Sequence, residues 1–418
     1  MILLFVADGR SPIAINWMRY FVDTGHEVHI ASIYPCQPDL ELASLTIIPV
    51  AFSSFTGEQG GGGAGGQGSG SAGVQGSGGV VRKIATPRVR TWLRHQFVPR
   101  SLPKTAANLQ SLISNLQPDL IHAMRIPYEG MLAALAHASL PASCREASPQ
   151  GGFPLLISIW GNDFTLHASA TRKMTQLTRL TLERADALHT DCHRDLRLAQ
   201  AWGFDEHKPG VVLPGAGGIQ MDVFYSSPPH PQSPSQGERG VVINPRGMRA
   251  YVRNDTFFQA IPRVLARQPH TRFTCPSMQN QPEAEKWASR LGVGDSLQLL
   301  PRLTRPEMAA AFRQSQIVIS ITEHDGTPNS LLEAMACGCF PVVGDIESLR
   351  EWITPGVNGF LVDPADPDAL ADAIVGGLQN PGLRARAREH NLRLIRERAE
   401  YGQVMGEAEK FYQSLLRP

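Results

Sequence analysis

Short apolar runs recur along the chain, and each is followed by a polar turn and then a stretch with helical spacing. Examples are residues 2–6, 155–159, 241–243 and 317–321. Apolar runs of this length are typical of strands buried inside a parallel sheet. Strands alternating with helices predict an α/β protein of βαβ units, with its ligands beyond the carboxyl ends of the strands.

A Pro- and Ser-rich segment with few apolar groups divides this pattern into two series. We expect a first Rossmann-like domain over residues 1–225, a linker over 226–240 and a second domain over 241–394. Residues 395–418 have apolar positions at helical spacing (Val404, Ala408, Phe411 and Leu415), which predicts a C-terminal helix with one apolar face. Residues 57–79 consist almost entirely of Gly, Ser, Gln and Ala, which predicts a flexible loop.

Composition narrows the class of protein. A chain of 418 residues with 42% hydrophobic and 18% charged residues is typical of a globular protein with two or three domains. A net charge of +1 argues against a protein that wraps nucleic acid, so no nucleic-acid partner is expected. Met1 is followed by an apolar run too short to span a bilayer, without a basic leader, and the six cysteines form no CxxC pair. These features predict a cytoplasmic protein.

The first βαβ unit lacks the GxGxxG pattern of dinucleotide-binding folds, so a dehydrogenase is not favoured. The strongest functional pattern lies instead in residues 317–344. There a strand, a turn with Asp325 and Gly326, a helix beginning near Asn329 and a second strand form one unit. Unpaired N–H groups at the helix start suit a phosphate, and Glu333, one turn further in, can accept hydrogen bonds from sugar hydroxyls. Two carboxylates beside such a helix start predict a nucleotide-sugar site.

These residues resemble the retaining GT-B glycosyltransferases of family 4. The family pattern is a Glu, seven residues, a second Glu, then Ala-Met-Ala-Cys-Gly and a Pro-Val-Val strand; here Asp325 and residues 333–343 match it, with Asp in place of the first Glu. The resemblance implies the GT-B fold: two Rossmann-like, doubly wound parallel-sheet domains facing a cleft, with a C-terminal helix that crosses back to the N-terminal domain.

The resemblance also implies roles on the donor side. In the family an Arg and, about seven residues later, a Lys clamp the donor diphosphate. Arg246 matches the first, and Arg253 or Arg249 takes the place of the Lys. Glu333 is expected to hold the ribose hydroxyls, and Asp325 the hydroxyls of the sugar ring. The other expected donor-binding residues are Gly217, Gly218, Gly326, Thr327, Pro328, Asn329 and Ser330.

Loops after three strands of the first domain are expected to face the acceptor. The segment around Trp160 resembles one in which a His-Gly pair lies near the reaction centre. Trp160 takes the His position, so Asp163 is the better candidate to contact the transferred sugar or the acceptor hydroxyl, while Trp160 either binds or packs. For the loop at residues 8–12 the alternative is an ordinary strand-to-helix turn. The acceptor-side residues are Ser11, Pro12, His122, Arg125 and Trp160.

Two further segments have features of binding sites. Residues 82–104 carry seven basic residues and no acid, interleaved with aromatic and apolar residues, which suits an anionic membrane surface, an acidic acceptor or simply a solvated face. Asp366-Pro367-Asp368 has the spacing of a metal-binding DxD, but an Asp before Pro is also what a capped helix start looks like. We expect no metal and no other cofactor.

The sequence thus predicts a glycosyltransferase that moves a sugar from a nucleoside diphosphate sugar to a hydroxyl of a glycan, lipid or small molecule, with retention of configuration. The candidate catalytic residues are Asp163, Asp325, Glu333 and Arg246. Peripheral contact with the inner face of the membrane would use residues 82–104. Two alternatives stay open: a nucleotide-sugar epimerase of GT-B fold and a non-catalytic nucleotide-sugar-binding module.

Overall fold

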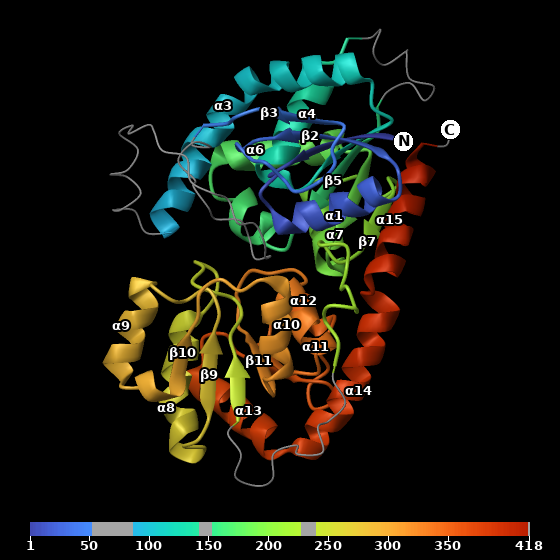
Figure 1. Cartoon of the computed structure of the whole chain (residues 1–418). Coiled ribbons are helices and arrows are strands. Elements are labelled where there is room, and N and C mark those ends of the chain that lie inside the picture. The colour runs from blue at the N-terminus through green and yellow to red at the C-terminus, as the bar shows by residue number, and fades with distance from the viewer. Residues whose placement is uncertain (52–86, 142–152, 227–239, 417–418) are drawn as a thin grey trace. The chain divides into compact units, whose positions relative to one another are not determined.

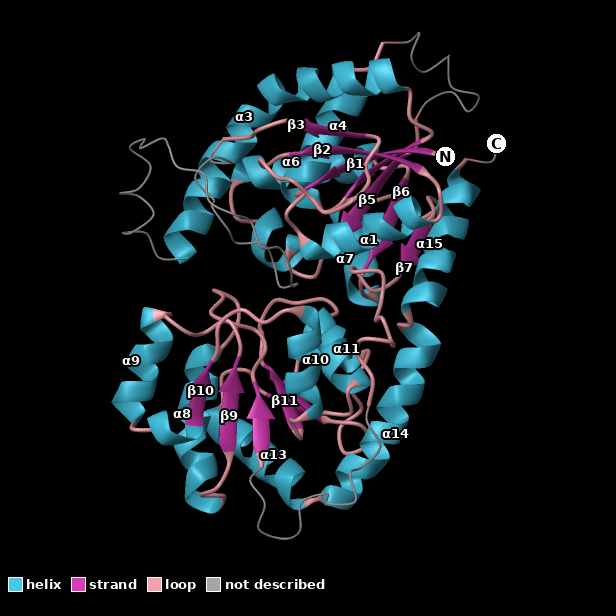
Figure 2. Cartoon of the chain, in the orientation of Figure 1, coloured by secondary structure: helices cyan, strands magenta, loops and turns pink. Residues whose placement is uncertain are grey.

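The computed structural model describes residues 1–51, 87–141, 153–226 and 240–416. The chain forms two compact units, Met1–Gly217 with Gln403–Pro418 (unit 1) and Gly218–Gly402 (unit 2). Each unit has one parallel sheet with helices on both faces (Figures 1 and 2). The α/β class predicted from the sequence is confirmed. The expected loop at 57–79 and nearly all of the expected linker at 226–240 lie outside the described residues, so those predictions stay predictions.

Unit 1 contains a seven-stranded sheet in the order β3-β2-β1-β4-β5-β6-β7. Its strands are β1 (Ile2–Ala7), β2 (Glu27–Ser32), β3 (Ser44–Ile47), β4 (Leu120–Ala123), β5 (Leu155–Ile159), β6 (Ala187–Thr190) and β7 (Gly210–Val212). In register, Phe5 of β1 lies opposite Ile30 of β2 and His122 of β4. The strand order reverses between β1 and β4, so the loops after these strands surround the point where such sheets bind ligands.

The helices of unit 1 divide between the two faces of the sheet because successive strand residues point to opposite sides. Ile121 and Ile157 face a core shared with α3 (Pro87–Leu116), α4 (Met131–Ala138), α6 (Arg172–Arg184) and α7 (His193–Trp202). Their neighbours His122 and Ser158 face the other side, which α1 (Pro12–Asp23) and α15 (Tyr401–Leu415) cover. Residues 87–104 of the basic segment 82–104 belong to the long helix α3.

Unit 2 repeats this arrangement with six strands in the order β10-β9-β8-β11-β12-β13. The strands are β8 (Val241–Ile243), β9 (Arg272–Cys275), β10 (Leu297–Leu299), β11 (Ile317–Ser320), β12 (Phe340–Gly344) and β13 (Phe360–Val362). The order reverses between β8 and β11, whose pairing places Val318 opposite Ile243. The loops after β8 and β11 therefore lie at the switch point of this second sheet.

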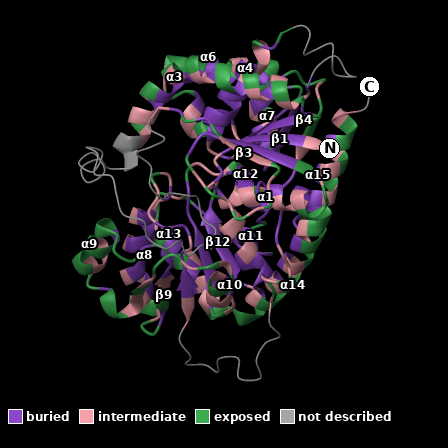
Figure 3. Ribbon diagram, turned by 45° about the horizontal axis from the view of Figure 1, so that its top comes forward, coloured by how far each residue is buried: buried purple, intermediate pink, exposed green. Residues whose placement is uncertain are grey.

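Both faces of the unit 2 sheet are buried. Ile317 and Ile319 pack with α8 (Asn254–Arg267), α9 (Pro282–Leu291) and α13 (Pro367–Gln379). Val318 packs on the opposite face with α10 (Arg305–Arg313), α11 (Asn329–Ala336) and α12 (Glu347–Arg350). Figure 3 shows the buried residues concentrated on the strands. Burial on two faces explains why the strands read as continuous apolar runs rather than alternating ones.

The chain ends with α14 (Pro381–Arg398) in unit 2 and α15, whose residues from Gln403 onward belong to unit 1. The buried residues of α15 are Val404, Met405, Ala408 and Tyr412. Of the predicted apolar face, Val404 and Ala408 are buried as expected. Phe411 and Leu415 are only half-buried, and Tyr412 is buried instead. In the part of the chain that the structure describes, every helix is too short or too polar to cross a bilayer.

Candidate functional site

The start of α11 forms a cradle for an anion in unit 2. β11 ends at Ser320, and α11 begins at Asn329 after Pro328, which stands at the N-cap with extended backbone (φ −68°, ψ 117°) and offers no capping side chain. The backbone N–H groups of Asn329 and Ser330 consequently have no acceptor among the described residues. Unsatisfied N–H groups and the positive end of the helix dipole both favour a negatively charged ligand.

Arg246 lies at this helix start because β8, which precedes it, pairs with β11. Its guanidinium donates to the Asp325 carboxylate, and its Nη1 donates to the Ser330 hydroxyl at 3.4 Å. The Arg246 side chain is only 7% exposed, and its Nε is buried with no hydrogen-bond partner in the described part of the chain. Three residues predicted to bind the donor thus lie together, with one donor atom still unsatisfied.

Glu333 lies one turn further into α11. Its half-buried carboxylate forms no hydrogen bond or ion pair with any other residue that the structure describes. Burial raises the pKa of Glu333 to about 7, and the charge of Arg305 opposes this shift. An unpartnered carboxylate that ionises near neutral pH can accept hydrogen bonds from ligand hydroxyls.

The second cation expected beside the diphosphate has two candidates, and the structure places them differently. Arg253 is held by Asp255, through contacts of 2.8 and 2.9 Å, and by Glu323 at 2.7 Å. Arg249 donates to the Tyr251 hydroxyl at 3.0 Å. The pKa of Arg249 is raised mainly by Tyr251 and, to a smaller degree, by the charge of Asp325. Of these two arginines, Arg249 is the one whose charge interacts with Asp325. The donor-binding role of either arginine stays a prediction.

Other residues of the predicted donor set have roles within unit 2. The Thr327 hydroxyl accepts a hydrogen bond from the Trp352 indole at 3.0 Å, and the Ser348 hydroxyl donates to the carbonyl of Asp325 at 2.7 Å; together they hold the loop that contains Gly326. Gly218 has φ +93°, and a Cβ there would lie 2.5 Å from the Ala399 carbonyl oxygen. Gly218 is thus required for packing, independently of any ligand.

In unit 1, Arg125 and Asp163 form a buried ion pair at the carboxyl ends of β4 and β5. Arg125 Nη2 donates to Asp163 Oδ1 at 2.8 Å, and Asp163 Oδ2 accepts from the backbone N–H groups of Ile126 and Trp160, each at 3.1 Å. Burial raises the pKa of Asp163, and Arg125 opposes that shift. The Arg125 guanidinium also lies 5.5 Å from the centre of the Trp160 ring. The structure therefore brings together three of the residues predicted on the acceptor side.

Gly217, the last residue of the first segment of unit 1, has φ +79°.

The loop after β1 leads directly into the start of helix α1. Ser11 is the N-cap of α1: its hydroxyl accepts from the N–H of Ala14 at 3.5 Å, and Pro12 takes the first helical position. This is the ordinary strand-to-helix turn, the alternative to an acceptor-binding loop. Binding of an acceptor by Ser11 or Pro12 stays a prediction.

His122 lies inside unit 1 rather than at its surface. It belongs to a chain of hydrogen bonds, the buried relay, that connects Trp17, Tyr412, His122, Ser158, His189 and the carbonyl of Leu213. The Trp17 indole can only donate and the Leu213 carbonyl can only accept, so every proton has one position: His122 and His189 both carry theirs on Nε2. Both ring nitrogens of His122 are therefore engaged within the protein, which leaves neither for an acceptor.

One cluster with metal-ligand chemistry was missed in the sequence. Asp191, Cys192 and Asp195 follow β6, are buried, and have potential ligand atoms within 4.8 Å of one another. The guanidinium of Arg194 contacts Asp195 at 2.7 Å and supplies a positive charge where a cation would bind. The signal was a D-C-x-x-D pattern directly after a strand.

For Asp366, the expected N-cap is confirmed, because its Oδ1 accepts from the N–H groups of Asp368 and Ala369.

Comparison with known proteins agrees with this architecture. The family model described as Glycosyl transferases group 1 matches residues 243–380, and the model described as Glycosyl transferase 4-like domain matches residues 11–215. A D-inositol 3-phosphate glycosyltransferase of Kribbella flavida is 29% identical over 222 residues, which cover 49% of this chain and 50% of that protein. The chain spans about half the length of the curated relatives it matches.

Two solved structures resemble the whole chain. HepE from Anabaena in complex with UDP superposes with a TM-score of 0.69 and 13% identity, over 99% of this chain and 100% of that one. A sucrose-phosphate synthase from Thermosynechococcus elongatus gives 0.70 and 14%, over 99% and 98%. The two parallel-sheet units therefore define a GT-B fold. The two family models place the chain more narrowly: it belongs to the group 1 glycosyltransferases, family 4.

Proposed function

We propose that this protein is a retaining glycosyltransferase that moves a sugar from a nucleoside diphosphate sugar to a hydroxyl of a glycan, a lipid or a small molecule. The observation that carries the proposal is the start of α11. There Arg246, whose Nε has no partner and whose Nη1 contacts Ser330, meets two backbone N–H groups without acceptors, and the unpartnered carboxylate of Glu333 lies one turn further into the helix. A carboxylate that accepts hydrogen bonds from hydroxyl groups, beside N–H groups that donate to phosphate oxygens, matches the chemistry of a nucleotide sugar. HepE, which shares the fold, has been solved with UDP-glucose.

In this proposal Glu333 accepts hydrogen bonds from the ribose hydroxyls, and Arg246 binds the diphosphate. Asp325 both orients Arg246, through the contact described above, and accepts hydrogen bonds from the hydroxyls of the sugar ring. Arg249 adds a second positive charge that interacts with Asp325. Charge that develops on the departing diphosphate is stabilised by these cations and by the N–H groups of Asn329 and Ser330, all of which are in place before the reaction.

Unit 1 supplies the acceptor site in this proposal. Arg125 holds Asp163 as a buried carboxylate beside the Trp160 ring, which offers a flat apolar surface to a sugar. The acceptor hydroxyl attacks the anomeric carbon from the side of the leaving diphosphate, whose oxygen takes the hydroxyl proton, so configuration is retained without a protein nucleophile. The bond to the phosphate oxygen breaks as the new glycosidic bond forms. No metal or other cofactor takes part in this scheme.

The proposal includes a peripheral contact between α3 and an anionic membrane. Trp92 and Phe97 are 57% and 46% exposed on this basic helix. Aromatic side chains among cations favour the surface of an anionic bilayer. Binding to vesicles that weakens as salt is added supports the contact, and no binding at low salt removes it.

The test of the proposed activity is an assay with UDP-, GDP- and ADP-sugars. Release of nucleoside diphosphate that requires an added acceptor, together with an NMR spectrum showing that the product keeps the donor's anomeric configuration, supports a retaining transferase. Conversion of the donor to its epimer without acceptor supports the epimerase instead. Binding without any turnover supports the non-catalytic module. Arg246→Gln and Glu333→Gln are expected to lose turnover, whereas Arg263→Gln, which removes a partly exposed arginine elsewhere in unit 2, is expected to keep it.

A further inference from the structure

The first turn of α7 contains a buried ion pair that the proposed transfer does not use. Arg194 is 6% exposed and Asp195 is 1% exposed. The Nε and Nη2 atoms of Arg194 donate to Asp195 Oδ1 at 2.9 and 2.7 Å. Nη2 also donates to the backbone carbonyl of Gly161 at 2.7 Å. Gly161 lies in residues 160–163, which follow β5 and which we call the β5 loop, so Arg194 joins α7 to this loop.

This position is costly for an arginine. A cation in the first turn of a helix lies at the positive end of the helix dipole, where it is unfavourable. Removing both charges from water costs energy as well, and their mutual attraction often does no more than offset that cost. Burial raises the pKa of Asp195, and the Arg194 guanidinium opposes that shift. The pair is therefore a weak source of stability, and its distinctive contribution is the hydrogen bond to Gly161.

Other contacts hold the β5 loop to itself and to the residues after β4. The N–H of Asp163 donates to the Trp160 carbonyl at 2.7 Å. Arg125 donates to Asn162 Oδ1 at 3.2 Å. The Gly161 carbonyl is held from the opposite side, by a helix that follows β6. The loop is thus fixed between the segments that follow the two neighbouring strands.

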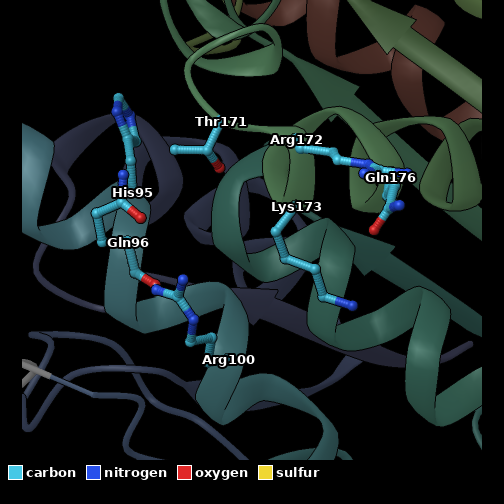
Figure 4. Close-up of a pocket in the computed structure, with 7 residues that line it drawn as sticks. All are labelled: His95, Gln96, Arg100, Thr171, Arg172, Lys173 and Gln176. Atoms are coloured by element: carbon cyan, nitrogen blue, oxygen red, sulfur yellow. The ribbon is translucent and has the colours of Figure 1, made fainter.

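The chain beyond the β5 loop is packed less closely. It forms the short helical segment η3 (Asp163–Ala168), in which His167 Nδ1 lies 2.8 Å from Nε2 of His95 on α3. A pocket of about 450 Å³ adjoins this end and is lined by His95 and by Thr171, the N-cap of α6 (Figure 4). A cavity of this size gives side chains room to shift. The end of the segment that Arg194 holds is therefore the more firmly fixed one.

The β5 loop presents an unsatisfied hydrogen-bond donor. The Nε1–H of Trp160 is buried and has no acceptor among the residues that the structure describes. A Cβ at Gly215 would lie 3.6 Å from this nitrogen and 3.5 Å from the Cβ of Asp191, so a turn without a side chain borders the indole edge. A buried donor without a partner beside such a turn suits an oxygen atom of a ligand. Its direction depends on the peptide of Gly161, the next residue.

We infer that Arg194 is a positioning residue for sugar transfer. Through the Gly161 carbonyl it keeps the β5 loop, and with it the Trp160 indole, in the orientation that the acceptor requires. Asp195 keeps Arg194 in place. This role rests on the proposed function, to which it adds two residues that touch neither substrate. Because the pair adds little stability, removing both charges should disturb transfer more than folding.

The decisive variant replaces both charges, Arg194→Met together with Asp195→Leu. Two apolar side chains of similar volume avoid the unpaired buried carboxylate that Arg194→Met alone would leave. The double variant is therefore expected to fold, with a melting temperature no more than about 5 °C below that of the wild type. The control is Arg197→Met, which removes an exposed arginine from the same helix.

The orientation of the loop is measured by fluorine NMR on the full chain labelled with 5-fluorotryptophan. The chain contains six tryptophans, and the Trp160 resonance is the one that Trp160→Phe removes. In the double variant this resonance is expected to shift or broaden by more than its linewidth in the wild type. The resonances of Trp287 and Trp352, both in unit 2, are expected to stay in place. In Arg197→Met the Trp160 resonance is expected to stay in place as well.

The effect on transfer is measured with UDP-, GDP- and ADP-glucose as donors, and with glycerol and the methyl glycosides of glucose, galactose and mannose as acceptors. In the double variant kcat/KM for the acceptor is expected to fall by about tenfold or more, since a misplacement of about 1 Å can cost a hundredfold in rate. KM for the donor is expected to stay within about twofold, because unit 2 binds the donor. The control is expected to stay within about twofold of the wild type in both.

An unchanged Trp160 resonance, a smaller fall in kcat/KM for the acceptor, or an equal fall in Arg197→Met overturns this role of Arg194 and leaves the proposed function standing. A larger loss of melting temperature, with the Trp287 and Trp352 resonances displaced too, identifies a merely structural pair and overturns it equally. If the wild type transfers glucose from none of the donors to any of the acceptors, the proposed function fails, and the role of Arg194 fails with it.

Discussion

Tyr412→Phe removes one oxygen atom from the centre of the buried relay and leaves the packing of the ring unchanged. The Tyr412 ring stacks on Phe21, with centroids 4.6 Å apart and planes within 9°, and phenylalanine can keep this contact. Its hydroxyl accepts from the Trp17 indole at 2.9 Å and donates to His122. The substitution therefore leaves a buried donor and a buried acceptor without partners.

A buried polar group left without its partner costs about 1–3 kcal/mol, so two such groups cost roughly 2–4 kcal/mol after partial relaxation. Since about 1.4 kcal/mol corresponds to a factor of ten, the local opening of α15 should become roughly 30-fold to several hundred-fold more frequent. The control is Tyr20→Phe. The Tyr20 hydroxyl contacts Glu409 at 3.0 Å in a partly exposed position, where the expected loss is about 0.5–1 kcal/mol.

Hydrogen–deuterium exchange of the α15 backbone, measured by mass spectrometry on the full chain, follows this opening directly. The expected result is much faster exchange of α15 in Tyr412→Phe than in Tyr20→Phe. Exchange of α15 in Tyr412→Phe within about threefold of the wild type would refute the assignment of the relay as a stabilising network.

Three further predictions follow from particular residues. Burial lowers the pKa of His189 to about 4 and that of His122 well below its usual value, so the unfolded chain binds more protons than the folded chain as the pH falls. The stability that these two histidines give to unit 1 is therefore fully present above about pH 6.5 and decreases as the pH falls toward 4. A melting temperature that is equal at about pH 7.5 and pH 5 would contradict this prediction. Arg249→Gln should weaken nucleoside diphosphate binding by about tenfold and Arg253→Gln by less than threefold, which calorimetric titration measures; the reverse order would restore Arg253 as the phosphate ligand. Gly218→Ala should lower the free energy of unfolding, measured by chemical denaturation, by more than about 2 kcal/mol because the new Cβ meets the Ala399 carbonyl. The control is Gly292→Ala: Gly292 also has positive φ but has nothing within 4 Å of a Cβ, so only the backbone cost of about 1 kcal/mol is expected. Equal losses in the two variants would exclude the clash.

Features that depend on short stretches of sequence could be predicted. The strand at residues 155–159 and that at 241–243 have the expected bounds, and α11 begins at Asn329, one residue after Pro328. Apolar runs and helix starts are determined by neighbouring residues, so one sequence suffices for them. The combination of Arg246 with Asp325 could be anticipated as well, because both follow strands that meet at the switch point of one sheet.

Features that depend on distant residues could not be predicted. His122 was expected at the carboxyl end of a strand and therefore near a ligand, but it lies within β4, and the Tyr412 hydroxyl, 290 positions later in the chain, occupies one of its ring nitrogens. Arg253 has the family spacing, yet Asp255 and Glu323 hold it. A pocket in unit 1 likewise combines Arg100 of α3 with Lys173 of α6, which are far apart in the sequence. Periodicity gives no information about such pairs, because they depend on the packing of whole elements.

The most direct test of the account is the affinity of UDP, GDP and ADP for the wild type and for Glu333→Gln as a function of pH. Because the pKa of Glu333 is raised to about 7, ribose binding by its ionised form should be strong above that pH and weaken as the pH falls below it. The account predicts that one nucleoside diphosphate binds the wild type with this pH dependence, and that Glu333→Gln binds it more weakly and without it. If none of the three binds, or if Glu333→Gln binds as tightly as the wild type at about pH 8, the assignment of the nucleotide site to the start of α11 is wrong.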